Sequence, residues 1–294
     1  MTNRKKEVIK NAHRLFLDKG FHATSIQDIL EYSGISKGTF YNYFSSKNEL
    51  LIDLIKTIYL GLDKSRNELL IGQDRSDISI FRKQIELQIA TNRKYNLLPL
   101  FEEVSASGDE ELKQFIKRGQ LRNINWKYER FVELFGEDKK TYLLDCAIMF
   151  TGMLQQNLRY YRMAYGPNGD AEPVVRYCVE RIAHLVEHVA DTGDQLLDPS
   201  MLHVWIPKEN NGDRQIQQEL SETIFVLKKK LVNNGENAKY LELVEFLHDE
   251  LLQTKHPRKF LIESCLLSLK QGKTSIEKKD LQQLEVLIEN FLSM

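Results

Sequence analysis

The sequence predicts an all-α protein, and three observations support this fold class. Apolar residues recur at intervals of three and four along most of the chain, which is the period of an amphipathic helix. Runs in which Val or Thr alternates with polar residues are scarce, and the glycines and six prolines lie mostly between the periodic segments. With 294 residues, 42% of them hydrophobic, the chain can form one large or two to three smaller domains.

The first two helices are expected close to the N-terminus. Residues 4–19 place their apolar side chains on one helical face, and Gly20 follows where a left-handed C-cap is favoured. The tetrapeptide Thr-Ser-Ile-Gln at 24–27 has the form of a capping box, which predicts that Thr24 caps a short second helix. Gly34 then supplies the residue that a tight turn between helices needs.

Two further helices are expected before about residue 70. Ser36 can cap a helix over residues 37–44, and the tetrapeptide Ser-Lys-Asn-Glu at 46–49 forms a second capping box at the start of a long helix. Two short helices joined by a glycine turn and braced by a preceding helix are typical of a helix-turn-helix, which places its second helix in the major groove of DNA. Generic packing of three helices is the alternative.

The composition of residues 37–44 favours DNA contact. Phe40 and Phe44 stand four residues apart, so both can face inward. Gly38 costs about 1 kcal/mol relative to alanine inside a helix, which is understandable where the backbone must approach DNA closely. The side chains that remain can donate to phosphates or base edges: Lys37, Thr39, Tyr41, Asn42 and Tyr43.

The stretch GISKGTFYNYFSSKNELL, preceded by AHRLFLDKGFHATSIQDIL, resembles the TetR family of bacterial transcriptional regulators from about Val8 to Ile55. The resemblance implies a homodimer that binds double-stranded operator DNA, usually a repressor, and that is released when a small molecule occupies the helical body. It implies that the start of the second helix and Lys47 contact phosphate, and from its side-chain chemistry we expect Asn42 to read bases. The DNA-binding residues predicted here are Thr24, Ser25, Ser36, Lys37, Gly38, Thr39, Tyr41, Asn42, Tyr43 and Lys47.

The charge distribution agrees with a local nucleic-acid contact but is weak support for one. The formal net charge is −1, so the whole chain is no polycation. Residues 1–57 hold nine Lys and Arg against six Asp and Glu, which leaves the remainder net negative.

Beyond Gly72 the helical period continues in longer units, expected at about 77–95, 97–107, 109–135, 137–165 and 171–192. The helices between 77 and 165 carry aromatic and thioether side chains that could line a chamber for a small hydrophobic or aromatic effector, although such residues also form ordinary cores. The ligand-binding residues predicted here are Phe101, Trp126, Tyr128, Phe131, Tyr142, Met149, Phe150, Met153 and Tyr160.

The last two of these helices are expected to form a homodimer by closing a four-helix bundle across a two-fold axis. One of them carries small residues and the other an apolar stripe, and an intramolecular core is the alternative for both. The dimer-interface residues predicted here are Ala147, Thr151, Gly152, Val175, Cys178, Ile182, Leu185 and Val189.

A boundary is expected within residues 191–212, which contain two prolines and precede further helical stripes. The predicted organisation is a helix-turn-helix domain at 1–47, a helical ligand-binding and dimerisation domain at 48–195, and an additional helical segment at 213–294. With this segment the chain is longer than is usual for the family. It could pack onto the body, form a separate partner-binding module or enlarge a dimer interface, and its wide apolar stripes favour packing onto the body.

Several classes of protein are disfavoured. The sequence has no GxSxG, P-loop, dinucleotide or HExxH motif, so an enzyme and a bound cofactor are not expected. Cys146, Cys178 and Cys265 are scattered, and the pair His184 and His188 lacks a third ligand, so no metal site is expected. Without a signal peptide or about 18 consecutive apolar residues, the chain is expected to be cytoplasmic and away from membranes. The alternative function is a DNA-bound adaptor regulated by a protein partner.

Overall fold

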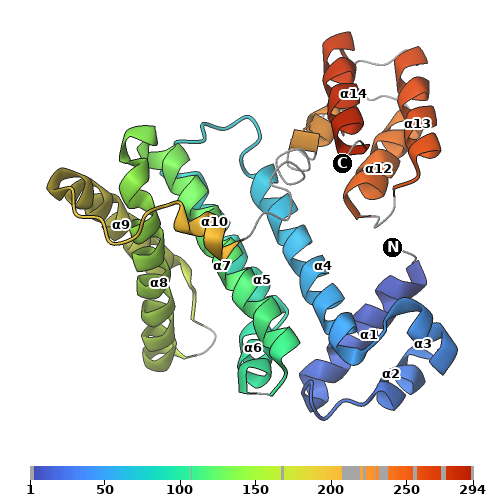
Figure 1. Cartoon of the computed structure of the whole chain (residues 1–294), viewed down its shortest axis with the longest axis horizontal. Coiled ribbons are helices and arrows are strands. Elements are labelled where there is room, and N and C mark those ends of the chain that lie inside the picture. Colours follow the sequence, from blue (N-terminus) through green and yellow to red (C-terminus); the bar gives the residue numbers. More distant parts are fainter. Residues whose placement is uncertain are drawn as a thin grey trace. The chain divides into compact units, whose positions relative to one another are not determined.

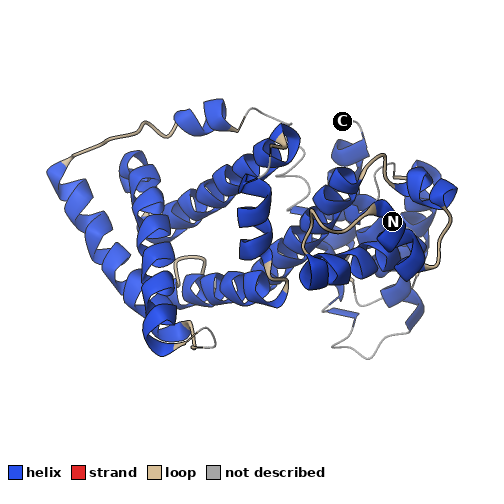
Figure 2. Cartoon of the chain, turned by 90° about the horizontal axis from the view of Figure 1, so that it is seen from below, coloured by secondary structure: helices blue, strands red, loops and turns tan. Residues whose placement is uncertain are grey.

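The computed structural model describes residues 3–106, 108–166, 169–206, 219–220, 223–228, 230–231, 238–253, 257–272 and 276–292. Every secondary-structure element in these ranges is a helix (Figure 2), which confirms the predicted all-α class. The chain forms two compact units, one covering Arg4–Pro207 and the other including Lys208–Met294. The division into three domains and the packing of the C-terminal segment onto the body stay predictions.

The N-terminal part contains four helices (Figure 1): α1 (Asn3–Lys19), α2 (Ile26–Ser33), α3 (Lys37–Tyr43) and the longer α4 (Lys47–Glu68). We call α1–α3 the reader. The predicted breakers act as expected, because Gly20 and Gly34 both adopt positive φ, at 85° and 60°. In this region an L-residue with a Cβ would be strained.

The capping box of α2 lies one residue beyond its predicted position. The N-cap is Ser25, whose hydroxyl accepts from the Asp28 amide at 3.1 Å, while the Asp28 carboxylate accepts from the Ser25 amide at 2.8 Å. Thr24 is buried instead, and its hydroxyl donates to the Gly20 carbonyl at 2.7 Å. The prediction that Thr24 caps α2 is therefore wrong: its side chain closes the end of α1, because the Gly20 carbonyl needs a partner there.

The reader shares its hydrophobic core with helices far along the chain. Phe16, Phe21 and Phe40 are buried in one cluster with residues of α4, α6 (Leu97–Ala106) and the start of α7 (Glu110–Phe135). The contributions of α6 and α7 are Leu97, Leu100, Val104, Leu112 and Ile116. The reader is thus packed against the helical body and not only joined to it through α4.

A second core lies within the body, between α5 (Ile78–Lys94), the later part of α7, α8 (Leu143–Tyr165) and α9 (Glu172–Thr192). Figure 1 shows α8 and α9 side by side, and the two helices pack against each other. The helix predicted at 137–165 is divided, because residues Glu137–Tyr142 form a 3-10 turn before α8 begins. Helix α10 (Met201–Trp205) contacts α7.

The C-terminal unit has a hydrophobic core of its own. It contains α12 (Ala238–Gln253), α13 (Lys259–Gln271) and α14 (Lys278–Leu292), and residues 223–228 are also helical. Leucine and isoleucine side chains from these segments form one buried cluster, as the wide apolar stripes require. Among the described helices of the whole chain, none is both long and apolar enough to cross a membrane.

Candidate DNA-binding site

Helix α3 is fixed within the reader by two phenylalanines, Phe40 in the helix and Phe44 directly after it. Phe40 and Phe44 are fully buried, and their rings lie 5.5 Å apart, centroid to centroid. The ammonium of Lys5 on α1 lies 4.7 Å from the centroid of the Phe44 ring. Phe40 belongs to the seven-residue helix and Phe44 is its extended C-cap residue, and burying both side chains holds the opposite face of α3 outward.

The outward face of α3 carries the residues predicted to contact DNA. Lys37, Gly38, Tyr41 and Asn42 are exposed, whereas Thr39 and Tyr43 are half-buried. The structure therefore brings four of the predicted side chains or backbone positions together on one accessible surface. We call this set the α3 face.

The turn before α3 is closed by local hydrogen bonds. The Ile35 amide donates to the Leu30 carbonyl at 3.1 Å, and the guanidinium of Arg4 donates to the Gly34 carbonyl at 3.2 Å. Ser36 caps α3, since its hydroxyl accepts from the Thr39 amide at 3.1 Å. Because Ser36 satisfies one of the free amides at the start of α3, the helix begins at a defined residue.

Gly38 is not required by the packing of the protein itself. A Cβ built at this position would meet only the Ser36 hydroxyl, at 3.8 Å, which is ordinary contact. Its backbone also lies outside the positive-φ region that favours glycine. Nothing within the protein therefore requires glycine at position 38, which is what we expect if DNA approaches this backbone closely.

Lys47 is directed to the turn between α1 and α2. Its ammonium donates to the carbonyls of Phe21 and Thr24, both at 2.7 Å, and lies 3.4 Å from the His22 carbonyl. It also lies 4.4 Å from the centroid of the Phe21 ring, and burial lowers the pKa of the lysine below its usual value. The carbonyls of this turn thus hold the Lys47 ammonium, and the predicted phosphate contact of Lys47 stays a prediction.

The same turn is held from its other side by Glu103 of α6. The Glu103 carboxylate accepts from the backbone amides of Phe21, at 3.0 Å, and His22, at 2.7 Å. Burial raises the pKa of Glu103, but these two amide donors outweigh that effect and leave the pKa lowered. Lys47 and Glu103 thus bind the carbonyls and amides of one turn from α4 and α6, and we call them the turn clamp.

The phosphate contacts predicted at the start of α2 meet a mixed environment. Ser25 is exposed, but Thr24 offers no exposed side-chain atom. The Asp28 carboxylate beside Ser25 accepts from Lys19 at 2.6 Å, and this bond, with those from Ser25, holds its pKa far below the usual value. A phosphate at this helix start would meet an ionised carboxylate that Lys19 already neutralises.

The predicted ligand-binding residues are divided between two hydrophobic cores and the surface, and their role stays a prediction. Tyr128, Phe131 and Phe150 lie in the second core, against which Trp126 and Met153 pack, whereas Phe101 packs against the reader's core. Met149 and Tyr160 are exposed on α8. The rings of Phe131 and Phe150 lie 5.8 Å apart and each also packs on Phe81, so these aromatic side chains fill the space between one another.

Half of the predicted dimer residues are buried inside the protomer. Ala147, Val175, Cys178 and Ile182 have no exposed surface and pack in the core between α8 and α9. The core alternative holds for these four, because the helix pair buries its apolar stripes against itself. Thr151, Leu185 and Val189 are half-buried and Gly152 is exposed.

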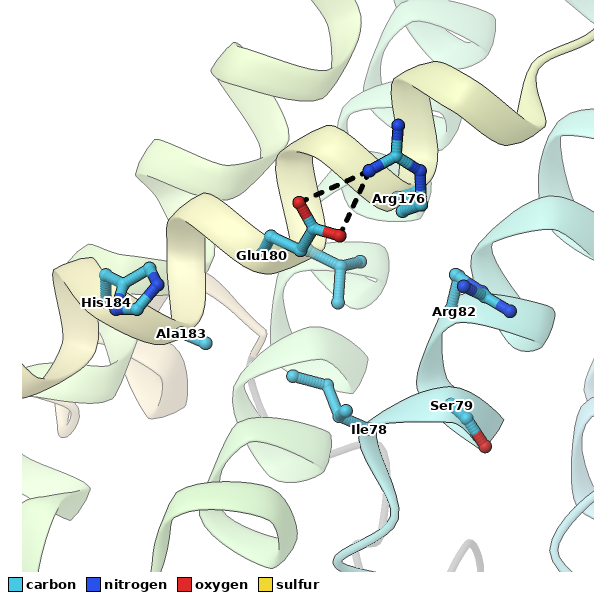
Figure 3. A pocket seen from close by; sticks show the side chains of 8 residues that line it. Ile78, Ser79, Arg82, Arg176, Glu180, Ala183 and His184 are labelled. Carbon is cyan, nitrogen blue, oxygen red and sulfur yellow. Dashed lines mark hydrogen bonds and ion pairs between the residues drawn. The ribbon is translucent and has the colours of Figure 1, made fainter.

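A surface cavity of about 320 Å³ lies between the start of α5 and α9, and Figure 3 shows the side chains around it. Its wall combines Ile78, Arg82 and His184 with Arg176, which pairs with Glu180 at 3.2 Å. None of the residues predicted to bind a ligand lines this cavity.

Sequence reasoning did not identify a group of buried charged residues in the body. Arg66 of α4 and Lys127 and Arg130 of α7 are each almost fully buried, and Gln84 of α5 lies with them. The available signal was the position of Lys127, three residues after Ile124 and four before Phe131, on the apolar stripe of its helix.

The geometry of α1–α4 defines a helix-turn-helix DNA-binding protein. The family model described as "Bacterial regulatory proteins, tetR family" matches residues 8–54. Residues 8–54 therefore form a TetR-type helix-turn-helix domain, as the resemblance predicts, and the relatives that match along the chain are helix-turn-helix transcriptional regulators.

Two relatives match along the full length of the chain, including its C-terminal unit. The uncharacterized HTH-type transcriptional regulator YerO of Bacillus subtilis (strain 168) is 28% identical over 98% of this chain and 96% of its own length. YuxN of the same organism, described in the same words, is 24% identical over 98% of this chain and 99% of its own. The HTH-type transcriptional repressor KstR2 of Mycobacterium tuberculosis is 32% identical over 19% of this chain and 28% of its own. No solved structure matches.

Proposed function

We propose that this regulator is a homodimeric repressor that binds operator DNA through α3 and is released by a small hydrophobic or aromatic ligand. The observation that carries the DNA-binding part is the α3 face, on which accessible polar groups stand opposite two buried phenylalanines. An anchored helix with one exposed polar face has the form that fits a major groove about 12 Å wide.

Within this proposal the residues of the α3 face have different roles. Asn42 is exposed, and its amide can both donate to and accept from an adenine edge, so it reads sequence. Lys37 is exposed at the start of α3, where a cation contacts phosphate and contributes equally at every sequence. Tyr41 can donate its hydroxyl to a phosphate, and the Gly38 backbone lies close to the DNA.

The dimer is proposed to place its two recognition helices one DNA turn apart, about 34–36 Å. The outward faces of α8 and α9 expose large apolar side chains that a second copy could cover, among them Tyr160, Met163 and Tyr177. A ligand that binds more tightly to a dimer with a different spacing of the recognition helices weakens operator binding by the ratio of its affinities for the two states. Helix α4 connects the reader to the body that would hold this ligand.

One observation favours the second candidate function, a DNA-bound adaptor regulated by a protein partner. The aromatic side chains expected to line a ligand chamber pack ring against ring, as Phe81, Phe131 and Phe150 do at 5.4–5.8 Å. A core filled in this way supports regulation without a small ligand.

A gel-shift titration of the full chain against its own upstream DNA tests the proposal. We expect saturable binding at nanomolar protein, reversed by one class of hydrophobic compound. The variant Asn42→Ala should lose preference for the specific site over competitor DNA by about tenfold or more, corresponding to about 1–3 kcal/mol per bidentate contact. Specific binding that no compound reverses would favour the adaptor. Absence of specific binding would refute the proposal.

A further inference from the structure

The two hydrophobic cores of the unit Arg4–Pro207 are distinct clusters, and buried polar residues lie on the helices that join them. Arg66 is 4% exposed, Lys127 is 2% exposed and Arg130 is 3% exposed. They come from α4 and α7, and α5 adds Gln84 and Gln88, which bond to the two arginines. We call this group the polar layer.

Arg130 has a full set of partners within the polar layer. Its guanidinium donates to Gln84 at 3.0 Å, to the Arg75 carbonyl at 3.1 Å and to the carboxylate of Glu133. Glu133 also accepts from Arg75 at 2.8 Å. The one carboxylate in these bonds is therefore already shared between two arginines.

Arg66 is less well satisfied. Its guanidinium donates to Gln88 and, at 3.3 Å, to Asp63, a residue whose side chain is 58% exposed. Its Nε is buried without a hydrogen-bond partner, and the guanidinium lies 3.7 Å from the centroid of the Trp126 ring. One face of a buried cation thus rests on an aromatic ring, while one of its donors is unused.

Lys127 has no hydrogen-bond or ion-pair partner in the described part of the chain. Burial, together with a smaller effect of the positive charge of Arg66, lowers its pKa from the usual 10.5 to about 7. An ammonium that is nearly fully buried, beside a second cation and without a carboxylate, is unfavourable, and a methionine or leucine would fit the apolar stripe of α7 better.

We infer that the polar layer is the place where the ligand's charged group binds, and that the ligand is an organic acid whose anion pairs with Lys127 and Arg66. A carboxylate can accept from both cations at once, including the unused Nε of Arg66. The inference rests on the proposed control by a ligand and changes the chemistry of that ligand, because a merely hydrophobic compound would leave the Lys127 ammonium without a counter-charge.

The position of the polar layer also links a bound anion to the reader through α4. Arg66 lies in the last turn of α4, and the first residue of that helix is Lys47 of the turn clamp. An anion held between Arg66 and Lys127 contacts α4 and α7 at the same time. Its binding therefore favours the placement of α4 in which both cations lie close to the anion.

Calorimetric titration of the full chain with matched acids and alcohols tests the inference. The probes are decanoate with decanol, and 1-naphthylacetate with 2-(1-naphthyl)ethanol, each pair differing mainly in charge. We expect at least one acid to bind tenfold or more tighter than its alcohol. We also expect proton uptake on binding at pH 7.5, detected with buffers of different ionisation enthalpy, because the anion raises the pKa of Lys127.

The variant Lys127→Met should lose both the preference for the acid and the proton uptake, whereas Lys117→Met, at an exposed position of the same helix, should retain them. Helical circular dichroism and operator binding of Lys127→Met show that the variant is folded. Equal binding of acid and alcohol in both pairs, no binding of either acid, or an acid preference that survives Lys127→Met would overturn the inference. Operator binding in the same samples would leave the proposed DNA-binding function standing.

Discussion

Replacing Lys127 by methionine is expected to stabilise the protein at neutral pH and to remove a pH dependence from its unfolding. The folded-state pKa of Lys127 is about 7, while its ordinary value is 10.5. Between these values the unfolded chain binds one more proton than the folded chain at this site. The free energy of unfolding of the wild type therefore rises with pH in this window.

The magnitude follows from the two pKa values. The contribution of Lys127 has half its maximal slope at pH 7 and approaches about 1.4 kcal/mol per pH unit above pH 8. Between pH 7 and pH 9 it adds about 2 kcal/mol to the stability of the wild type. The variant Lys127→Met lacks this increase but no longer buries an unpaired cation, so it should be more stable than the wild type by about 1–4 kcal/mol at pH 7.

Urea unfolding at pH 7, 8 and 9 measures these differences for the wild type, Lys127→Met and the exposed control Lys117→Met. Other groups also contribute in this range, among them Cys146, whose pKa burial raises from its ordinary value of 9.0 to about 11, so that its thiol loses its proton near pH 9 only in the unfolded chain. Their contributions cancel in the difference between wild type and variant. An advantage of Lys127→Met that stays constant from pH 7 to pH 9, or a variant less stable than the wild type at pH 7, would refute this account of the polar layer.

Three further predictions concern the reader. Gly38→Ala should stabilise the fold by up to about 1 kcal/mol in thermal unfolding yet weaken operator binding; unchanged binding would contradict a close approach of DNA. Lys37→Ala should lower the slope of log K against log salt concentration by about 0.9, while the exposed Lys64→Ala should not change it; equal slopes for the two would exclude the phosphate contact of Lys37. Lys47→Met should reduce the free energy of unfolding by about 1–3 kcal/mol, because the carbonyls of the turn lose their donor, and should change the salt slope less than Lys37→Ala does.

The reader could be predicted from the sequence because its signals act over a few residues. Ser36 caps α3 and Gly34 adopts a left-handed conformation, as short-range chemistry requires. The register of the α2 cap was missed by one residue, since both Thr24 and Ser25 can cap. The end of α1 places the Gly20 carbonyl next to Thr24, and the hydrogen bond between them keeps the Thr24 side chain in the interior.

The body was less predictable because a helical stripe shows that a face is buried but not against what. Cys178 and Ile182 fit a dimer interface and an internal core equally well by spacing, and they pack against α8 of their own chain. The environment of Lys127 depends on Arg66, which lies 61 residues away in sequence and on another helix. Nothing within α7 itself indicates that these two cations meet.

The turn clamp has a consequence for how this regulator can be divided or recombined. Glu103 reaches its amide partner on Phe21 across 82 residues of sequence, and side chains of α6 and α7 complete the core beneath the reader. A fragment ending near residue 47 would leave these amides without their acceptor and expose the apolar side chains that α6 covers. A chimera that transfers this operator specificity to another protein therefore has to carry α6 and the start of α7 along with the reader, or supply surfaces of matching shape and charge.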